Sequence, residues 1–436
     1  MASSNPPSKS ALQRFLGAAS PDKVVPLVGV HLNVASYAFC YWLTRPVEPF
    51  LLEKLGGSAQ SFGLLQSWFS FLMLLGGPFI GRVCDSKGAH IGLMVCQMGA
   101  ALGYGFTGLA RNLPLLFLAR VPQVFMHVMQ ASQAVVAHCA NDDARAVAMG
   151  RLSLSYRVGM VAGSVLGGTL ALRVGNAGVM LLGALVSALS LPFTYICVPA
   201  SSVKVAAAAA STASAGATNI PVASEDKQHD GLNLGRIVEV MRAPAVRRLI
   251  TMHVALSLGQ DLLGPFSPTT SSVLKEAFGL DAQQLGLTMS LQSLVGLFAN
   301  VFLIGPIARW HKNDEFAMVR SGAIVNAVCA AAFSLARRGN LLQVYAVLAP
   351  ICLANSVTST TVASLYSKSC DQRDAGTCIA LQHAVGTFLG IFLPTAGTYM
   401  YANLGGVKPV AFGSAACLLF AGFIIKTDRT SGEKSN

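Results

Sequence analysis

The chain has 436 residues, of which 53% are apolar and 11% are charged. About 25% of the residues in a typical soluble domain are charged, so this composition excludes an ordinary soluble globular protein. The mean hydropathy is +0.56, and the apolar residues come in blocks of about 18 to 25, long enough to cross the roughly 30 Å hydrocarbon core of a bilayer. The net charge of +12 must first be explained by membrane topology before a nucleic-acid partner is considered.

Twelve apolar spans follow one another along the chain and predict an all-α polytopic membrane protein with 12 transmembrane helices. The spans are residues 24–44, 60–80, 91–110, 114–138, 147–172, 177–198, 247–267, 283–305, 316–336, 341–364, 376–400 and 406–425. A long polar segment divides them into two six-helix bundles, residues 24–198 and residues 247–425. The polar residues 1–23 carry no cleavable signal pattern, so we expect the first span to act as an uncleaved anchor.

The distribution of Lys and Arg predicts the orientation of these spans. With residues 1–23 and 426–436 as cytoplasmic tails, cytoplasmic segments hold 21 of the 31 Lys and Arg residues and external loops hold eight. This count assigns the cations within about five residues of a span end to the adjoining segment, and the remaining two, Arg120 and Arg157, lie deeper inside spans. An excess of cations on the cytoplasmic side is typical of membrane proteins, so both termini are predicted inside and no nucleic-acid partner is expected.

The longest polar segment, residues 199–246, is predicted to be a flexible cytoplasmic linker. It contains the low-complexity run Val205–Ala217, whose small and polar residues cannot bury enough area to fold. Its last part, Leu232–Arg242, places apolar residues on one side and charged residues elsewhere. A short interfacial helix is the structure that this pattern predicts.

The segment after the second span combines Gly81, Asp85 and Gly88. Two glycines around a carboxylate predict a tight turn that holds Asp85 at the membrane face. A carboxylate is stabilised by the partly positive N-terminal end of a helix, and the span near Ala375 begins on the same side. Asp85 is therefore a candidate gate residue, and an ordinary solvated turn is the alternative.

The fifth span carries Gly159, Gly163 and Gly167 at four-residue spacing, followed by Gly168. These glycines line one helix face and allow a neighbouring helix to approach closely, which supplies packing energy in lipid. Ordinary small-residue packing explains this pattern as well as a functional motif does.

Together these patterns and the stretch Arg120-Val121-Pro122-Gln123 resemble a transporter of the major facilitator superfamily. The short loop between the first two spans is similar to that of the drug/proton antiporter branch, and the stretch 62–168 resembles an organic cation transporter-like member. The resemblance implies two six-helix bundles, alternating access, and small organic solutes, including cations, exchanged for protons.

The fourth span presents Arg120, Gln123, His127 and Gln130, which fall on one narrow face of a regular helix. Four hydrogen-bonding groups on one face are typical of the lining of a wet cavity. An intramembrane charge is costly and needs a reason. Arg120 is therefore a candidate for binding, with a structural strut tied to backbone carbonyls as the alternative.

The seventh span repeats this pattern with His253, Gln260 and Asp261. Asp261 is the only carboxylate well inside any predicted span. A carboxyl group that alternates between dry and wet surroundings can take up and release a proton, and it can also pair with an organic cation. The alternative is a hydrated Asp261 at the external mouth. Arg157 in the fifth span is a further candidate for the site.

The sequence predicts a secondary transporter and not an enzyme, because no catalytic, phosphate-binding or zinc motif is present. No cofactor or metal is expected; the partners are a small-molecule solute, the proton and the lipid bilayer, and the chain is expected to be a monomer in the plasma membrane or an endomembrane. Two other interpretations stay open. One is a proton-independent uniporter or organic anion carrier, and the other is a non-transporting membrane scaffold or receptor.

Overall fold

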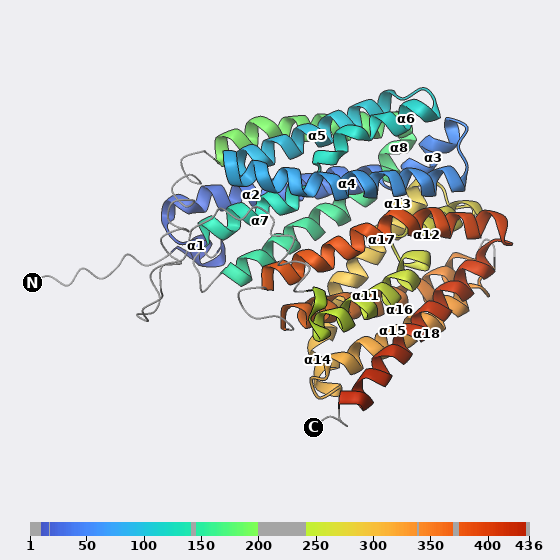
Figure 1. Cartoon of the computed structure of the whole chain (residues 1–436). Coiled ribbons are helices and arrows are strands. Elements are labelled where there is room, and N and C mark those ends of the chain that lie inside the picture. The colour runs from blue at the N-terminus through green and yellow to red at the C-terminus, as the bar shows by residue number, and fades with distance from the viewer. Residues whose placement is uncertain are drawn as a thin grey trace, which may run out of the picture. The chain divides into compact units, whose positions relative to one another are not determined.

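The computed structural model describes residues 10–16, 18–140, 145–198, 241–337, 340–368 and 375–432. Within these ranges the chain is almost entirely helical and contains no β-strand, only one isolated backbone bridge between Ala18 and Ala140. The chain forms two compact units: Met1–Arg45 with Leu75–Ala223, and Pro46–Leu74 with Ser224–Asn436. Figure 1 shows their helices. Most of the predicted linker and interfacial helix, residues 199–240, lies outside the described residues.

The first unit is built around the long helix α8 (Arg145–Cys197), which packs on α2 (Val24–Thr44) and on α5 (Ala89–Leu109) (Figure 1). The other elements of this unit are α1 (Ala11–Leu16), η1 (Pro21–Lys23), α6 (Leu113–Ala119), η2 (Val121–Phe125), α7 (Val128–Cys139) and the second part of α4 (Ala59–Lys87). Gly175 interrupts α8 with a φ of 73° and a ψ of 168°, a conformation that glycine adopts without strain. The break falls between the predicted fifth and sixth spans.

The glycines of the predicted fifth span lie against the backbone of α2. A Cβ atom at Gly159, Gly163 or Gly167 would collide with the carbonyl oxygen of Ala35, Phe39 or Leu43, respectively. The missing side chains therefore allow α8 and α2 to approach to backbone contact over two helical turns. Gly168 is buried on the same helix.

The prediction that a loop begins at Gly81 is wrong. Helix α4 continues through Asp85 to Lys87, and the turn is confined to Gly88, whose φ is 97°. Nothing in residues 81–87 breaks a helix, and the single residue with a left-handed φ is enough to reverse the chain into α5. Asp85 is exposed on the last turn of α4, and its predicted contact near Ala375 stays a prediction.

The prediction of one regular helix face in the fourth span is also wrong. The helix ends at Ala119, a 3₁₀ turn follows, and α7 begins only at Val128, because Pro122 lacks the N–H group that a continuous helix would need. Three glycines on neighbouring helices make room for this irregular backbone. A Cβ at Gly76 or Gly99 would meet the carbonyl oxygen of Val124 or Pro122, and a Cβ at Gly103 would meet the side chain of Gln123.

The second unit contains α11 (Pro244–Leu263), α15 (Glu315–Phe333), α16 (Leu341–Lys368), α17 (Ala375–Asn403) and α18 (Val407–Gly432), which pack in a bundle around α11 (Figure 1). Its other elements are α3 (Glu48–Lys54), the first part of α4, α12 (Pro268–Glu276), α13 (Ala282–Phe298), the π-helical turn η4 (Ala299–Leu303) and α14 (Ile304–Trp310). Asp281 caps α13 by accepting a hydrogen bond from the backbone N–H of Gln284 at 2.7 Å.

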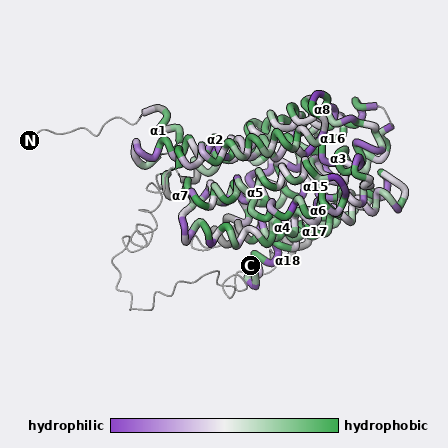
Figure 2. The backbone as a smooth tube through the Cα atoms, turned by 90° about the horizontal axis from the view of Figure 1, so that it is seen from above, coloured by the Kyte–Doolittle hydropathy of each residue, from purple (hydrophilic) through white to green (hydrophobic). Residues whose placement is uncertain are grey.

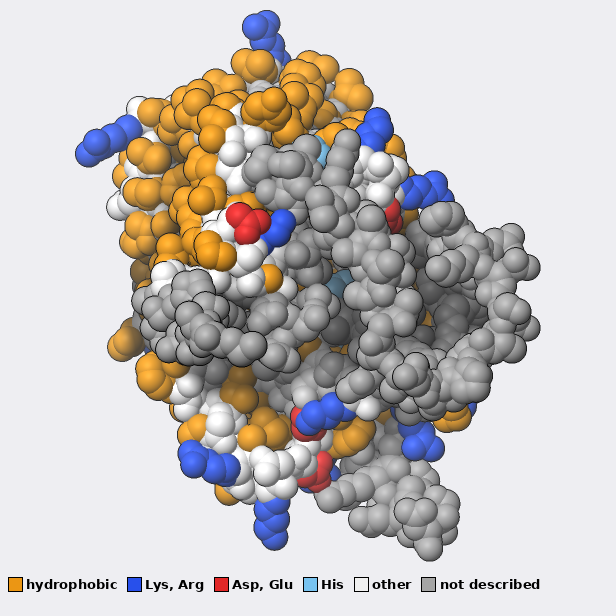
Figure 3. All heavy atoms as spheres, turned by 90° about the vertical axis from the view of Figure 1, so that its left-hand side faces the viewer, with side chains coloured by type: hydrophobic (Ala, Val, Ile, Leu, Met, Phe, Trp, Pro, Cys, Tyr) orange, Lys and Arg blue, Asp and Glu red, His pale blue; other side chains and the backbone are white. Residues whose placement is uncertain are grey.

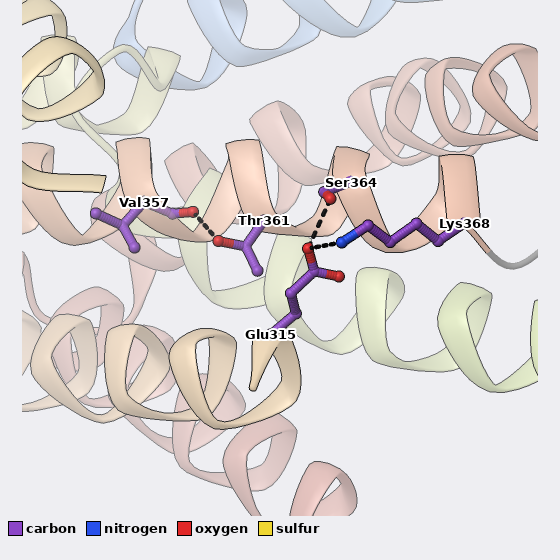
Figure 4. A network of polar contacts seen from close by, with 5 residues as sticks. All are labelled: Glu315, Val357, Thr361, Ser364 and Lys368. Carbon is purple, nitrogen blue, oxygen red and sulfur yellow. Dashed lines mark hydrogen bonds and ion pairs between the residues drawn. The ribbon is translucent and has the colours of Figure 1, made fainter. Parts of the chain in front are cut away.

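A carboxylate joins α15 to α16 at one end of this bundle. Figure 4 shows Glu315 on the first turn of α15 pointing toward α16. Its Oε1 atom accepts a hydrogen bond of 2.7 Å from the Ser364 hydroxyl and forms an ion pair of 2.7 Å with Lys368 Nζ. Glu315 also lies near the N-terminal end of its own helix, where a negative charge is favourable.

At the other end, Lys275 joins α12 to α3. Its Nζ atom lies 2.8 Å from a carboxylate oxygen of Glu53, donates a hydrogen bond of 3.1 Å to the carbonyl oxygen of Pro49, and lies 5.1 Å from the ring centroid of Phe50. The Lys275 side chain is 11% exposed, so these contacts replace most of its water. They fix the short helix α3 against α12.

We expect the difference in thermal stability between the Glu276→Gln variant and the wild type to shift in favour of the variant as the pH rises from acid to neutral. Burial raises the pKa of Glu276 above its ordinary value of 4.5, and Glu53 adds to this rise while Lys275 opposes it. An acid with a raised folded-state pKa stabilises the fold only while protonated, so the wild type loses this contribution as the pH rises above about 4.5. Melting curves in detergent at acidic and neutral pH measure this difference. An equal difference at both pH values would contradict the prediction.

The surface of the helices is strongly apolar. Seven helical segments among the described residues are long and apolar enough to cross a membrane. Figure 2 shows hydrophobic residues along most of the helices, with hydrophilic residues gathered near helix ends and connections. On the face drawn in Figure 3, hydrophobic side chains cover much of the described surface and Lys and Arg side chains are scattered among them. These features are those of a multi-pass membrane protein.

Candidate functional site

The predicted polar residues of the fourth span fall into two pairs in the first unit. Arg120 is 4% exposed, and its Nη1 atom donates a hydrogen bond of 3.0 Å to Gln123 Oε1 beside helix α5. Gln130 instead donates to the carbonyl oxygen of Gly77 at 3.3 Å, and His127 lies against the same part of α4. The helix break therefore directs the first pair to α5 and the second pair to α4.

Other polar residues of the first unit are used in packing its helices together. Asn33 on α2 accepts a hydrogen bond of 2.7 Å from Gln97 on α5 and donates one to Thr194 on α8. Tyr37 donates its hydroxyl at 3.1 Å to the carbonyl oxygen of Met126, next to the helix break. Buried polar groups need such partners, and these contacts satisfy them without a solute.

The second unit contains a cavity of about 380 Å³ between the first part of α4, helix α11 and helix α17. Its lining residues come from the middle parts of these helices and are Phe69, Ser70, Met73, His253, Gln382, His383, Gly386 and Thr387. A volume of this size is within the range of roughly 300 to 1,000 Å³ found for small-molecule sites.

Close packing of α4 on α17 sets one end of this cavity. The hydroxyls of Ser67 and Thr395 are 2.7 Å apart, and a Cβ atom at Gly63 would collide with the side chain of Thr398. One turn further, a Cβ at Gly390 would lie 2.9 Å from Ser70 Oγ. Small residues therefore hold these helices together up to Ser70. At Gly386, one turn beyond Gly390, an added Cβ would meet no atom within 4 Å.

His253 is the predicted site residue that the structure places on the cavity. Its ring lies edge-to-face against Tyr366 on α16, with 5.8 Å between the ring centroids. Its Nδ1 atom is buried and has no hydrogen-bond partner among the described residues. His253 also interacts electrostatically with His383 on α17. A buried polar atom without a partner costs about 1 to 3 kcal/mol, so a bound solute or water that satisfies it would stabilise this arrangement.

Gln260 and Asp261 lie on the same helix as His253 but outside the cavity lining. Eight residues separate Asp261 from His253, which is a rise of about 12 Å along a helix. Asp261 is half-buried near the end of α11, and Gln260 Nε2 has no hydrogen-bond partner in the described part of the chain. The structure therefore separates a predicted proton site from the imidazoles of the cavity. Arg157 is half-buried on α8 in the first unit.

The donor set of the cavity does not form a metal centre. Across the described residues, no group of three or more His, Cys, Asp or Glu side chains is placed to hold a metal ion. What the lining offers is a combination of two imidazoles, an amide, two hydroxyls, an aromatic ring and a thioether. Such a lining can enclose an apolar body and hydrogen-bond a polar head.

Sequence reasoning missed the contribution of α4 to this cavity. Phe69, Ser70 and Met73 belong to an apolar span with no intramembrane charge, so nothing in their residue types separates a cavity face from a lipid face. The available signal was the helical spacing of the small residues Gly63, Ser67 and Ser70, which indicates a helix face that another helix approaches closely.

Residues 30–395 match the sequence profile of the Major Facilitator Superfamily. The chain belongs to this superfamily. Human solute carrier family 67 member A1 is 31% identical over 382 residues, which cover 86% of each chain. Mouse solute carrier family 22 member 18 is 29% identical over 376 residues, covering 84% of this chain and 87% of the mouse protein.

Two further similarities concern a part of the sequence and the fold. The class G tetracycline resistance protein of Vibrio anguillarum is 30% identical over 135 residues, 29% of this chain and 34% of that protein. The crystal structure of the human organic anion transporter MFSD10 superposes with a TM-score of 0.63 at 20% identity, covering 93% of this chain and all of that one. The predicted membership and the all-α membrane fold of the major facilitator superfamily are confirmed.

Proposed function

We propose that this member of the major facilitator superfamily is a secondary transporter that moves a small organic solute by alternating access in exchange for protons. The cavity on α4, α11 and α17 is the proposed solute site. The observation that carries this proposal is a cavity of about 380 Å³ whose lining combines polar side chains, among them His253, with an aromatic ring and a thioether.

Proton coupling is assigned in this proposal to Asp261. It is a half-buried carboxylate on α11, the helix that also supplies His253 to the solute site. A carboxyl group whose surroundings change between dry and wet during transport binds and releases a proton. The exposed Asp85 on the last turn of α4 is proposed as the cytoplasmic gate residue.

The names of the relatives point to different solutes, namely an organic anion for human MFSD10 and tetracycline for the Vibrio anguillarum protein. A proton-independent uniporter would transport at a rate that ignores a pH gradient. A scaffold or receptor would instead lose its function when residues 201–228 are deleted, whereas a transporter should tolerate a modest shortening there.

We expect the Gly386→Phe variant to lose at least about nine-tenths of its solute uptake, because the new side chain fills space that the solute needs. A Cβ at Gly386 meets no atom within 4 Å, so the substitution does not force the helices apart. Gly305→Phe is the matched control, since Gly305 on α14 is exposed, also has open space around it, and does not line the cavity.

Uptake into proteoliposomes by both variants tests the location of the site. Loss of uptake in Gly386→Phe, with normal uptake in Gly305→Phe and equal thermal stability of the two proteins, is the expected result. Normal uptake by Gly386→Phe would show that the solute binds elsewhere and would overturn the assignment of this cavity.

A further inference from the structure

We propose that the cavity on α4, α11 and α17 binds solutes through an acidic group, such as a carboxylate, in preference to an amine. This inference rests on the proposed function, because it assumes that the cavity is the solute site. It goes further by giving the sign of the charge that the site accepts. The resemblance of motifs had pointed toward cations, whereas the cavity lining favours anions.

Among the described residues, the lining contains no acidic group that could neutralise a cation. Its polar side chains are those of Ser70, His253, Gln382, His383 and Thr387, and no Asp or Glu is among them. Burying an ammonium group without a counter-charge costs several kcal/mol. A histidine, by contrast, presents one N–H donor to an anion when neutral and two when protonated.

Two imidazoles belong to the lining of this one cavity. His253 comes from α11 and His383 from α17, and the two side chains interact electrostatically. Two protonated rings would repel each other, and a carboxylate bound to both would remove this repulsion. An imidazole N–H group that donates to such a ligand forms a charge-assisted hydrogen bond.

In the part of the chain that the structure describes, few other titratable groups surround this pair. Tyr366 on α16 contacts His253 through its ring, whereas α4 contributes only Phe69, Ser70 and Met73, none of which titrates near neutral pH. Proton uptake that accompanies binding of an acid would therefore fall to the two histidines. Binding of an anion should become tighter as the pH falls through the range in which imidazole titrates.

The remainder of the lining suits an apolar body. Phe69 and Met73 present an aromatic ring and a thioether to the same space, and both side chains adapt to flat, apolar solutes. The chemical class that fits is an amphipathic organic acid with an aromatic or aliphatic body and a single carboxylate.

The test uses three probes of nearly equal size: 3-phenylpropanoate, 3-phenylpropanamide and 3-phenylpropylamine. Their binding to the purified full chain is measured at about pH 5 and about pH 8, well below and well above the ordinary imidazole pKa of roughly 6.5. We expect the carboxylate to bind at least about tenfold more tightly than the amine at the lower pH, as charge-assisted hydrogen bonds would provide. This preference should shrink at the higher pH.

The Gln382→Glu variant sharpens the test, because it adds a negative charge to the lining with almost no change in volume. It should weaken binding of the carboxylate at least about tenfold and strengthen binding of the amine. Gln283→Glu is the matched control. Gln283 lies on the first turn of α13, outside the cavity, where an added carboxylate is favourable.

The His253→Gln and His383→Gln variants should each remove the pH dependence of carboxylate binding. Tighter binding of the amine by the wild type, or pH dependence that survives in both variants, would overturn the inference. Absence of binding by all three probes at millimolar concentration would also overturn it. The uptake test with Gly386→Phe is independent of these binding results. If that variant loses uptake, the cavity is still the solute site, even when the preference for carboxylates is overturned.

Discussion

Replacing Asp261 with Asn is expected to abolish the part of solute transport that is driven by a pH gradient, while the protein still folds. Asp261 lies half-buried on α11, about 12 Å along the helix from His253. Asn has nearly the same size and can form hydrogen bonds, but it cannot carry a proton. The variant should transport at the same rate with and without an imposed pH gradient, whereas the wild type should be faster with it.

Asp281→Asn provides the control for this substitution. Asp281 is an exposed carboxylate that caps α13 through its bond to the N–H of Gln284, and Asn caps helices about as well as Asp. The control removes one carboxylate without touching the proposed proton site, so it should keep the full response to the gradient. An Asp261→Asn variant that also keeps this response would remove Asp261 from the coupling mechanism.

Replacing Gly163 with Val is expected to destabilise the first unit by at least about 2 kcal/mol, because overfilling a close-packed contact forces side chains and backbone apart. A Cβ at Gly163 would collide with the carbonyl oxygen of Phe39 and lie 3.0 Å from the backbone nitrogen of Leu43. Both atoms are backbone of α2 and cannot rotate away. A lower melting temperature and a smaller yield of monodisperse protein are the results that we expect.

Gly150→Ala on the same helix is the matched control. An added Cβ at Gly150 meets no atom within 4 Å and the residue is exposed. Alanine at such a helical position stabilises a helix by about 1 kcal/mol or less. The melting temperature of this variant should therefore be unchanged or slightly raised. A Gly163→Val protein as stable as Gly150→Ala would contradict the close contact between α8 and α2.

The positions of most helices could be predicted from the sequence, because long apolar blocks separated by polar residues have few solutions in a bilayer. The glycine spacing of the fifth span also indicated a close helix contact, and the structure places Gly159, Gly163 and Gly167 against α2. Short motifs in the sequence indicated membership of the superfamily, and the match of residues 30–395 to its sequence profile confirms it.

The helix breaks and the cavity could not be predicted with the same success. Pro122 interrupts the fourth span only because glycines on α4 and α5 leave space for the irregular backbone, and that depends on helices distant in the sequence. Phe69 and Met73 line the cavity although neither differs in character from a lipid-facing residue. His253 was found because a polar residue within an apolar span needs a reason.

We propose above that this chain transports a small organic solute in a reaction coupled to protons. The most direct measurement is uptake of solutes from a panel of organic acids and amines into proteoliposomes, with and without an imposed pH gradient of either direction. At least one solute should accumulate beyond its equilibrium level, and reversing the gradient should reverse the direction of accumulation. Uptake that is equal with and without the gradient for every transported solute would contradict it.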